Sequence, residues 1–448
     1  MTIAERIGMN RKELITAPFE KEKEYMEYRI KTGIEENRKD FLTIEVRGKN
    51  GNVLPGVQVE LEQKSHQFMF GANLFLLDEM ETEEKNQEYR RLFPKLFNQA
   101  TLPFYWCDLE PEPGKTRYGK DSVRIYRRPN PELCLEFCEE NQITPKAHCL
   151  IFDVFTPVWV PGDIEQSRKE IHRHLHEVAQ RYNKRIRDWE VTNETLIPLR
   201  PMNTPLFSTD NYVEWCFETA HRYFPANRLL FNESGDFVWP DFQGTRSAYY
   251  QLIERALNMG KHIDGIGMQY HVCCSREDEV KKTEKFYDPR RLYDVMDTYG
   301  RFRIPLQITE ITIPAYSNMQ QDEEVQAEIV RNLYRIWFSH PAMEGIIWWN
   351  MVDGYAFAPE GSGEGENVFH GGLLRHDMSK KPVWYVLDEL INREWHTRES
   401  RTTDGWGKVT VRGFYGNYRI KIFYENRVVE REISLNCRDN VRKFEIKI

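Results

Sequence analysis

The sequence predicts a (β/α)8 barrel that carries a small accessory β-module. Between about residues 66 and 395, short apolar runs rich in β-branched residues alternate with longer helical patterns, as expected for repeated βα units. There are eight such runs over roughly 330 residues, which is the number of strands that closes this barrel. Before and after that region the pattern changes to strands and turns, which predicts the accessory module.

Residues 1–64 are expected to precede the barrel. The first 40 residues are strongly charged with helical spacing, so we expect one or two helices that pack on a larger body. Residues 41–47 and 57–62 then alternate apolar and polar side chains on either side of Asn50-Gly51. An Asn-Gly pair between alternating runs is a strong hairpin signal. We therefore predict a β-hairpin over 41–62 that belongs to the accessory sheet.

Residues 65–398 are predicted to form the barrel. The expected strands are 68–72, 99–103, 144–149, 187–192, 228–232, 265–270, 305–309 and 345–349. The helical patterns between them include 132–141, 164–183, 211–224, 246–259, 289–299 and 322–338. A doubly wound sheet is the structural alternative, but the first strand is not followed by the Gly-rich phosphate turn of that fold.

Residues 399–448 return to short alternating runs. The expected strands are 408–412, 418–424, 428–433 and 442–448. Together with residues 41–62 they are enough for one small β-module built from both ends of the chain. We expect these two segments to pair with each other.

The composition limits the kinds of molecule that this protein is expected to bind. The 448 residues carry a net charge of −8, and no basic stripe indicates binding to nucleic acid or to an anionic membrane. The N-terminus lacks a secretory signal pattern and no 18-residue apolar segment follows. The sequence as written is thus expected to be cytoplasmic, or secreted if a leader has been removed. It does not determine the oligomeric state.

The cysteines and histidines do not predict a metal site. The eight cysteines fall at no metal-ligand or disulfide-framework spacing, so they are expected to be reduced thiols. His172, His174 and His176 lie on a charged helical pattern without a further ligand nearby, which favours a solvated helix face over zinc. We expect neither a metal nor a cofactor.

Two predicted strands end on a carboxylate. The run 188–194 ends in Glu194, and the run 305–310 ends in Glu310. Barrel strands deliver reactive side chains to the mouth of the fold at their C-terminal ends. Glycoside hydrolysis requires two carboxyl groups, one protonated to release the leaving oxygen and one ionised to attack the sugar carbon or to activate water.

Other polar and aromatic residues converge on the same rim of the predicted barrel. The candidates for substrate binding are His148, Asn193, Asn232, Gln269, His271 and Trp349. Amides and imidazoles can bond sugar hydroxyls, and an indole face can stack on a pyranose. For Asn232-Glu233, substrate binding and bracing of the barrel rim are both open.

These segments resemble glycoside hydrolase family 10, the family of retaining endo-β-1,4-xylanases. The resemblance spans about residues 68–393. It rests on the segments 109–114 (LEPEPG), 147–150 (AHCL), 156–159 (TPVW), 189–194 (WEVTNE), 265–271 (GIGMQYH) and 307–310 (QITE), with Trp349 and Asp353.

The resemblance implies a role for each candidate. Glu194 would be the general acid/base and Glu310 the nucleophile, separated by about 5 to 5.5 Å. Asn193 would bond the 2-hydroxyl of the reacting sugar, and His148 would bond the same sugar. Gln269 and His271 would orient Glu310, and Trp349 would form the floor of the sugar site. The implied partner is a β-linked oligo- or polysaccharide of xylan type, and no metal or cofactor is needed.

Three departures from the family pattern affect the substrate. Residues 101–106 (TLPFYW) stand where xylanases of this family usually carry Glu-Asn-x-x-Lys-Trp, whose polar members bind the distal xylose, and residues 152–155 (FDVF) replace Trp-His-x-Gln. Thr312 replaces an Asp. Losing polar partners in a sugar subsite changes discrimination by several kcal/mol.

Three functions follow from these matches and departures. The first is endo-1,4-β-xylanase-like hydrolysis. The second is the same mechanism on a different β-glycoside, including exo-action on a short oligosaccharide. The third is a non-catalytic carbohydrate-binding protein on the same scaffold. The intact pair Glu194 and Glu310 argues against the third, because a pure binder has no use for a proton donor.

Overall fold

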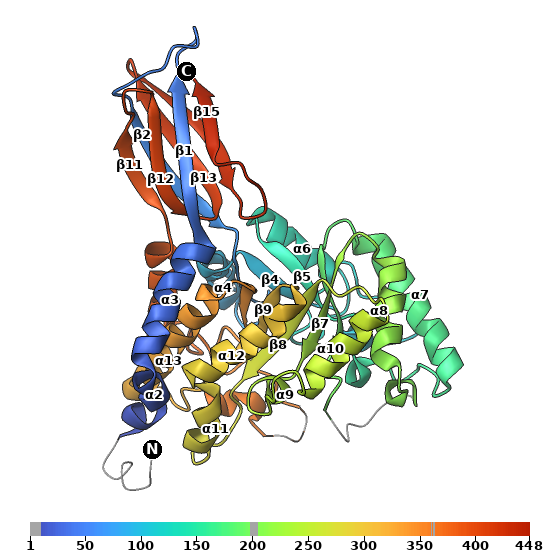
Figure 1. Ribbon diagram of the computed structural model, residues 1–448. Helices are drawn as coiled ribbons and strands as arrows, with labels where there is room; N and C mark the ends of the chain where they lie inside the picture. The colour runs from blue at the N-terminus through green and yellow to red at the C-terminus, as the bar shows by residue number, and fades with distance from the viewer. Residues whose placement is uncertain (1–9, 198–204, 360, 362) are drawn as a thin grey trace.

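The computed structural model describes residues 10–197, 205–359, 361 and 363–448. At its centre is a closed barrel of eight parallel strands in the order β10-β3-β4-β5-β6-β7-β8-β9 (Figure 1). The strands are β3 Met69–Asn73, β4 Gln99–Pro103, β5 Thr144–His148, β6 Asp188–Asn193, β7 Arg228–Glu233, β8 Gly265–His271, β9 Leu306–Thr312 and β10 Met343–Trp348. This confirms the predicted fold class. The observed strand ends lie within three residues of the predicted ones.

Helices cover the barrel. The longer ones are α4 Glu83–Leu96, α6 Pro131–Glu140, α7 Ile164–Tyr182, α8 Tyr212–Tyr223, α10 Ala248–Asn258, α12 Pro289–Tyr299, α13 Gln320–Ser339 and α14 Pro382–Glu389. Local sequence signals determine several starts: Asn130 and Asp163 each cap a helix through the side chain, and Pro131 and Pro289 occupy the first helical positions. Every residue of β6 and β9 is buried, as expected for parallel strands that are covered on both faces.

Two helices precede the barrel, as predicted. They are α2 Arg11–Lys21 and α3 Lys23–Arg38, and both pack against α13. Ile15, Phe19, Met26 and Ile30 from these helices belong to the same hydrophobic core cluster as the barrel. The lead-in helices are therefore part of the barrel body.

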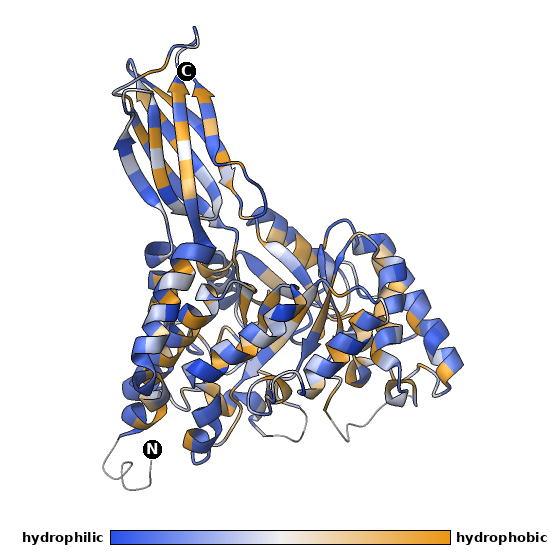
Figure 2. Cartoon of the chain, viewed as in Figure 1, coloured by the Kyte–Doolittle hydropathy of each residue, from blue (hydrophilic) through white to orange (hydrophobic). Residues whose placement is uncertain are grey.

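The accessory module consists of two small sheets with strands from both ends of the chain (Figure 1). In the first sheet, β1 Lys39–Arg47 lies between β12 Lys408–Phe414 and β15 Lys443–Lys447. In the second, β2 Gln58–His66 lies between β11 Arg398–Thr402 and β13 Gly416–Tyr424, and β14 Arg427–Leu435 is at the edge. The predicted pairing of the two ends of the chain is confirmed. Figure 2 shows hydrophobic and hydrophilic residues alternating along these strands.

The predicted hairpin over 41–62 is wrong. β1 and β2 are strands, but they lie in different sheets, and only an isolated bridge between Arg47 and Val53 connects residues on the two sides of the turn. Gly51 has φ of 80°, as a turn requires. The apolar faces of β1 and β2 belong to one core cluster, so the connection crosses from one sheet to the other. Instead of pairing with each other, β1 and β2 each pair with strands from the C-terminal segment.

The module lies at the N-terminal end of the barrel strands. A cavity of about 770 Å³ separates the two parts and is lined by residues at the starts of β3 and β10 together with Phe414, Tyr415 and Asn436. The C-terminal strand ends are thus free of the module.

Among the described residues, none of the helices has the length and apolar character to span a membrane.

Candidate active site

The predicted site residues come together at the C-terminal ends of the barrel strands. Glu310 lies in β9 and is only 3% exposed. Asn232 and Gln269 reach it from β7 and β8, and His271 ends β8. Asn193, at the end of β6, accepts hydrogen bonds from Asn232 at 2.8 Å and from Gln269 at 3.1 Å. Neighbouring parallel strands bring their C-terminal ends to one rim, which is why residues distant in sequence meet here.

Four side chains surround the carboxylate of Glu310. Its Oε1 accepts hydrogen bonds from Asn232 Nδ2 at 2.9 Å and Gln269 Nε2 at 3.2 Å. Its Oε2 lies 3.0 Å from His271 Nε2, and His148 Nδ1 is 3.9 Å from Oε1. Burial alone would lower the pKa of His271, but the hydrogen bond and charge of Glu310 outweigh burial and raise it. The carboxylate is held in one orientation with both oxygens engaged.

Glu194 lies just past the end of β6, in a left-handed backbone conformation with φ of 53°. This conformation is uncommon for a non-glycine residue and tends to occur at functional sites. Gln269 Nε2 donates to Glu194 Oε1 at 3.1 Å and to Glu310 Oε1 at 3.2 Å. One amide nitrogen therefore contacts both candidate catalytic carboxylates.

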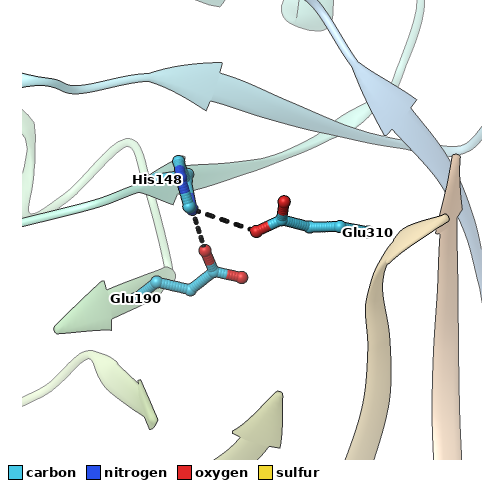
Figure 3. A group of neighbouring side chains, drawn as sticks. All are labelled: His148, Glu190 and Glu310. Carbon is cyan, nitrogen blue, oxygen red and sulfur yellow. Dashed lines mark hydrogen bonds and ion pairs between the residues drawn. The ribbon is translucent and has the colours of Figure 1, made fainter. Parts of the chain in front are cut away.

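A buried ion pair lies beneath the site, and the sequence analysis missed it. Lys146 Nζ is 2.5 Å from Glu190 Oε1. The other oxygen of Glu190, Oε2, is hydrogen-bonded to His148 Nδ1 (Figure 3). Burial would raise the pKa of Glu190, but Lys146 and His148 outweigh it and the pKa is lowered. The sequence does contain a signal for this ion pair. A lysine and a glutamate lie in the middle of two adjacent predicted strands, where a buried charge without a partner is costly.

His148, Glu190 and Glu310 also form a cluster that could hold a metal ion, because their donor atoms lie within 4.8 Å of one another. Lys146 already contacts Glu190 and supplies the positive charge that a metal would bring. We therefore assign this cluster to a lysine–glutamate–histidine network.

The prediction that His172, His174 and His176 lie on a solvated helix face is wrong for His174. His174 is fully buried, its ring stacks on Trp106 with centroids 4.6 Å apart, and burial lowers its pKa to about 3. The helical period of α7 turns this residue toward the barrel.

Glu233 braces the segment that carries Glu194. It is fully buried at the end of β7 and accepts hydrogen bonds from Thr195 Oγ1 at 2.8 Å, Leu196 N at 3.2 Å and Ser234 N at 2.8 Å. Burial, partly offset by these hydrogen bonds, raises its pKa to about 7, with a smaller contribution from the charge of Glu194. Of the two roles left open for Glu233, the geometry favours bracing.

Asn232 is fully buried as well. It donates to Asn193 Oδ1 at 2.8 Å and to Glu310, and it accepts from Thr309 Oγ1 at 2.6 Å. These contacts favour a role in holding Glu310 over direct contact with a sugar.

Trp349 follows β10 and is 7% exposed. It belongs to an aromatic cluster with Phe75, Tyr105, Phe152 and Phe155. Three of these rings come from the segments where the sequence departs from the family pattern. Two polar positions of the family pattern, those of Tyr105 and Phe155, thus carry rings of a packed aromatic group.

Comparisons with known proteins agree with this geometry. The family model for Glycosyl hydrolase family 10 matches residues 76–388. Anti-sigma-I factor RsgI6 of Acetivibrio thermocellus is 25% identical over 87% of this chain and 45% of its own length. Endo-1,4-beta-xylanase 2 of Arabidopsis thaliana is 23% identical over 86% of this chain and 32% of its own length. The chain thus spans less than half of these curated relatives.

Solved structures share the fold. Xylanase 10B from Thermotoga petrophila RKU-1, solved in complex with xylobiose, superposes with a TM-score of 0.56 at 21% identity, covering 73% of this chain and 95% of that one. Native xylanase 10B from Thermotoga maritima superposes with the same TM-score at 20% identity, covering 73% and 96%. Because the family model spans well over half of the chain, including both strand-end glutamates, the chain belongs to glycosyl hydrolase family 10.

Proposed function

We propose that this protein hydrolyses β-glycosidic bonds of xylan-type oligosaccharides with net retention of configuration. The observation that carries the proposal is the amide of Gln269, which contacts Glu194 Oε1 at 3.1 Å and Glu310 Oε1 at 3.2 Å. One amide nitrogen in contact with both carboxylates keeps them close together, which favours the about 5–5.5 Å separation of retaining enzymes over the roughly 6.5–9.5 Å of inverting ones.

The reaction has two steps. Glu310 attacks the anomeric carbon while Glu194 gives its proton to the departing glycosidic oxygen, which leaves a covalent glycosyl-enzyme. Glu194, now ionised, then takes a proton from water, the water oxygen attacks the anomeric carbon, and the bond to Glu310 breaks. The hydrogen bonds from Asn232, Gln269 and His271 hold Glu310 in line for attack.

Support for the sugar class comes from the relatives, several of which are named endo-1,4-beta-xylanases. The aromatic cluster supports the same mechanism on a different β-glycoside as the alternative. Tyr105 and Phe155 lie in this cluster. In the family pattern, the position of Tyr105 is a Lys that binds the distal xylose, and the position of Phe155 is a Gln.

The test is hydrolysis of aryl β-glycosides and defined β-oligosaccharides by the wild type and by Glu310→Gln and Glu194→Gln. We expect Glu310→Gln to lose turnover on every substrate. Glu194→Gln should lower kcat/KM about 10²- to 10⁴-fold on poor leaving groups and far less on activated aryl glycosides, whose departure in the first step needs no proton. The exposed Glu430 on β14 provides the control Glu430→Gln, which should keep full activity.

Product configuration, followed by NMR, tests retention separately. An initial product with inverted configuration, or unchanged turnover in Glu310→Gln, would contradict the proposal. Carbohydrate binding without hydrolysis is the second candidate, because a relative that matches 87% of this chain is named an anti-sigma factor and not a hydrolase. Sugar binding without turnover across the panel would establish that candidate.

A further inference from the structure

We propose that an aromatic wall of Phe75, Tyr105, Phe155 and Trp349 closes the cleft directly beyond the reacting sugar. The enzyme would then release single sugars from the non-reducing end of its substrate. This inference rests on the proposed function and specifies its mode of action, which the sequence leaves open between endo and exo.

The wall is built from four separate segments. Phe75 follows β3, Tyr105 follows β4, Phe155 ends the 3₁₀ turn η1 Asp153–Phe155, and Trp349 follows β10. The rings of Tyr105 and Phe155 stack with centroids 4.0 Å apart. Phe75 packs edge to face on Tyr105 at 5.9 Å and on Trp349 at 5.2 Å. These contacts make one continuous group of rings.

Three of the four wall rings are buried and offer no face to a second sugar, and Phe155 is partly buried against them. Phe75, Tyr105 and Trp349 are 1%, 6% and 7% exposed. A platform that stacks on a sugar needs an open ring face, but Tyr105 is covered by Phe155. The rings therefore fill space that a further sugar would need.

Arg128 holds the wall in place. Its guanidinium carbon lies 4.3 Å from the centre of the Tyr105 ring, a cation–π contact. Its Nε donates to Asp108 Oδ2 at 2.6 Å, and its Nη1 donates to the carbonyl oxygen of Arg127 at 3.0 Å. Arg128 is itself only 8% exposed, so Tyr105 cannot swing aside without breaking buried contacts.

The wall stands one side chain away from the nucleophile. The Tyr105 ring packs edge to face on His148 at 5.3 Å, and His148 Nδ1 is 3.9 Å from Glu310 Oε1. A second sugar on that side of Glu310 would overlap Tyr105 or Phe155.

The position of Glu194 shows which end of the substrate is blocked. The leaving oxygen takes its proton from Glu194, so the leaving group extends on that side. Glu194 follows β6 and contacts Gln269 of β8. Of the wall residues, Phe75 and Trp349 follow β3 and β10, which lie three and four strands from β6 around the barrel, and Tyr105 follows β4, two strands from β6. The wall therefore closes the end that carries the non-reducing terminus.

The test is the product pattern from β-1,4-xylohexaose labelled at its reducing end. We expect the labelled pentamer to appear first and the ladder to shorten one sugar at a time, with xylose as the small product. Cross-linked dyed xylan should release almost no soluble dye. If another sugar is the better substrate in the panel, its own labelled oligosaccharide takes the place of xylohexaose.

Variants of the wall test whether these rings cause the release of single sugars. Tyr105→Ala with Phe155→Ala should raise the release of disaccharide relative to monosaccharide by about tenfold or more, with hydrolysis of aryl β-monosaccharides still measurable. Phe155→Gln, a milder change, should shift the ratio in the same direction and keeps the test valid if the double variant does not fold. Tyr385→Ala, at a tyrosine 60% exposed on α14, should leave the ratio unchanged.

The outcomes separate this inference from the proposed function. Short labelled fragments as the first products of the wild type, or an unchanged product ratio in folded wall variants, would overturn the inference alone. Failure of the wild type to hydrolyse any glycoside would overturn the proposed function and the inference with it.

Discussion

At the scale of single residues, the main unexpected feature is the buried pair of Lys146 and Glu190. Both side chains are at most 1% exposed and lie 2.5 Å apart. Removing two charges from water costs several kcal/mol each, and the attraction between them offsets this cost only while both are present. The pair is therefore costly to break and much less costly to replace as a whole.

Lys146→Met should lower the free energy of unfolding by about 3–5 kcal/mol, because Glu190 would remain buried without its cation. Adding Glu190→Leu should recover at least half of that loss. Urea denaturation measures both. The exposed pair of Lys115 and Glu112 is the control, and Lys115→Met should cost less than about 1 kcal/mol. A small effect of Lys146→Met would mean that Glu190 is solvated.

Glu233 predicts a pH dependence of stability. Burial raises its pKa from the ordinary 4.5 to about 7, so between these values the folded protein holds a proton that the unfolded chain has released. The stabilisation is fully present below pH 4.5 and is lost as the pH rises through 7, with a total of about 3 kcal/mol. Glu233→Gln, which mimics the protonated form, should lose less stability between pH 5 and pH 8. Identical pH profiles from urea denaturation would contradict this.

At the scale of elements, helix α3 is joined to the barrel by Arg38. Its guanidinium donates to the carbonyl oxygens of Phe338 and His340 at 2.5 Å and of Met343 at 2.7 Å. Burial lowers its pKa to about 9. These carbonyls lie at the end of α13 and the start of β10, so one side chain ties the lead-in helix to the barrel.

Arg38→Met should destabilise the protein by about 2–4 kcal/mol, because the variant removes three hydrogen bonds to carbonyl groups at the end of α13 and the start of β10. Thermal unfolding followed by circular dichroism measures the loss. Lys23→Ala, at the start of the same helix in an exposed pair with Glu20, should change stability by less than about 1 kcal/mol. Equal effects of the two substitutions would show that Arg38 does not link the helix to the barrel.

At the scale of the whole molecule, the barrel and the module have separate cores. The module's cluster takes Leu42, Ile44 and Val46 from β1 and Val59 and Leu61 from β2, and its other members include Val411, Ile420 and Ile422 from the C-terminal strands. Neither end of the chain can complete this core alone. The module is therefore one unit assembled from two distant segments, at the barrel end opposite the candidate site.

A truncated protein that begins at residue 65 should leave residues 402–448 unfolded, because β12, β13 and β15 would lose β1 and β2 as partners. Limited proteolysis should then remove the C-terminal segment rapidly, while the full-length chain resists under the same conditions. If the truncated protein kept this segment resistant to protease, the module would not need its N-terminal strands.

The sequence alone predicted the barrel and the carboxylate pair. Runs such as 188–194 and 305–310 have the length and composition of buried strands and end on Glu194 and Glu310, and both carboxylates meet at Gln269. Such signals are local, because strand period, helix caps and strand-end residues depend on neighbours in the chain. Closure of a parallel barrel then places all C-terminal strand ends on one rim.

Only the tertiary structure decided which strands pair and which side chains of different elements contact one another. The alternation of residues 41–47 and 57–62 defined two strands but could not show that β1 and β2 pair with the C-terminal segment in different sheets. The contact of Lys146 with Glu190, and the stacking of Tyr105 on Phe155, likewise join residues on different elements. Periodicity reports which face of an element is buried, whereas the residue that covers that face is set by long-range packing.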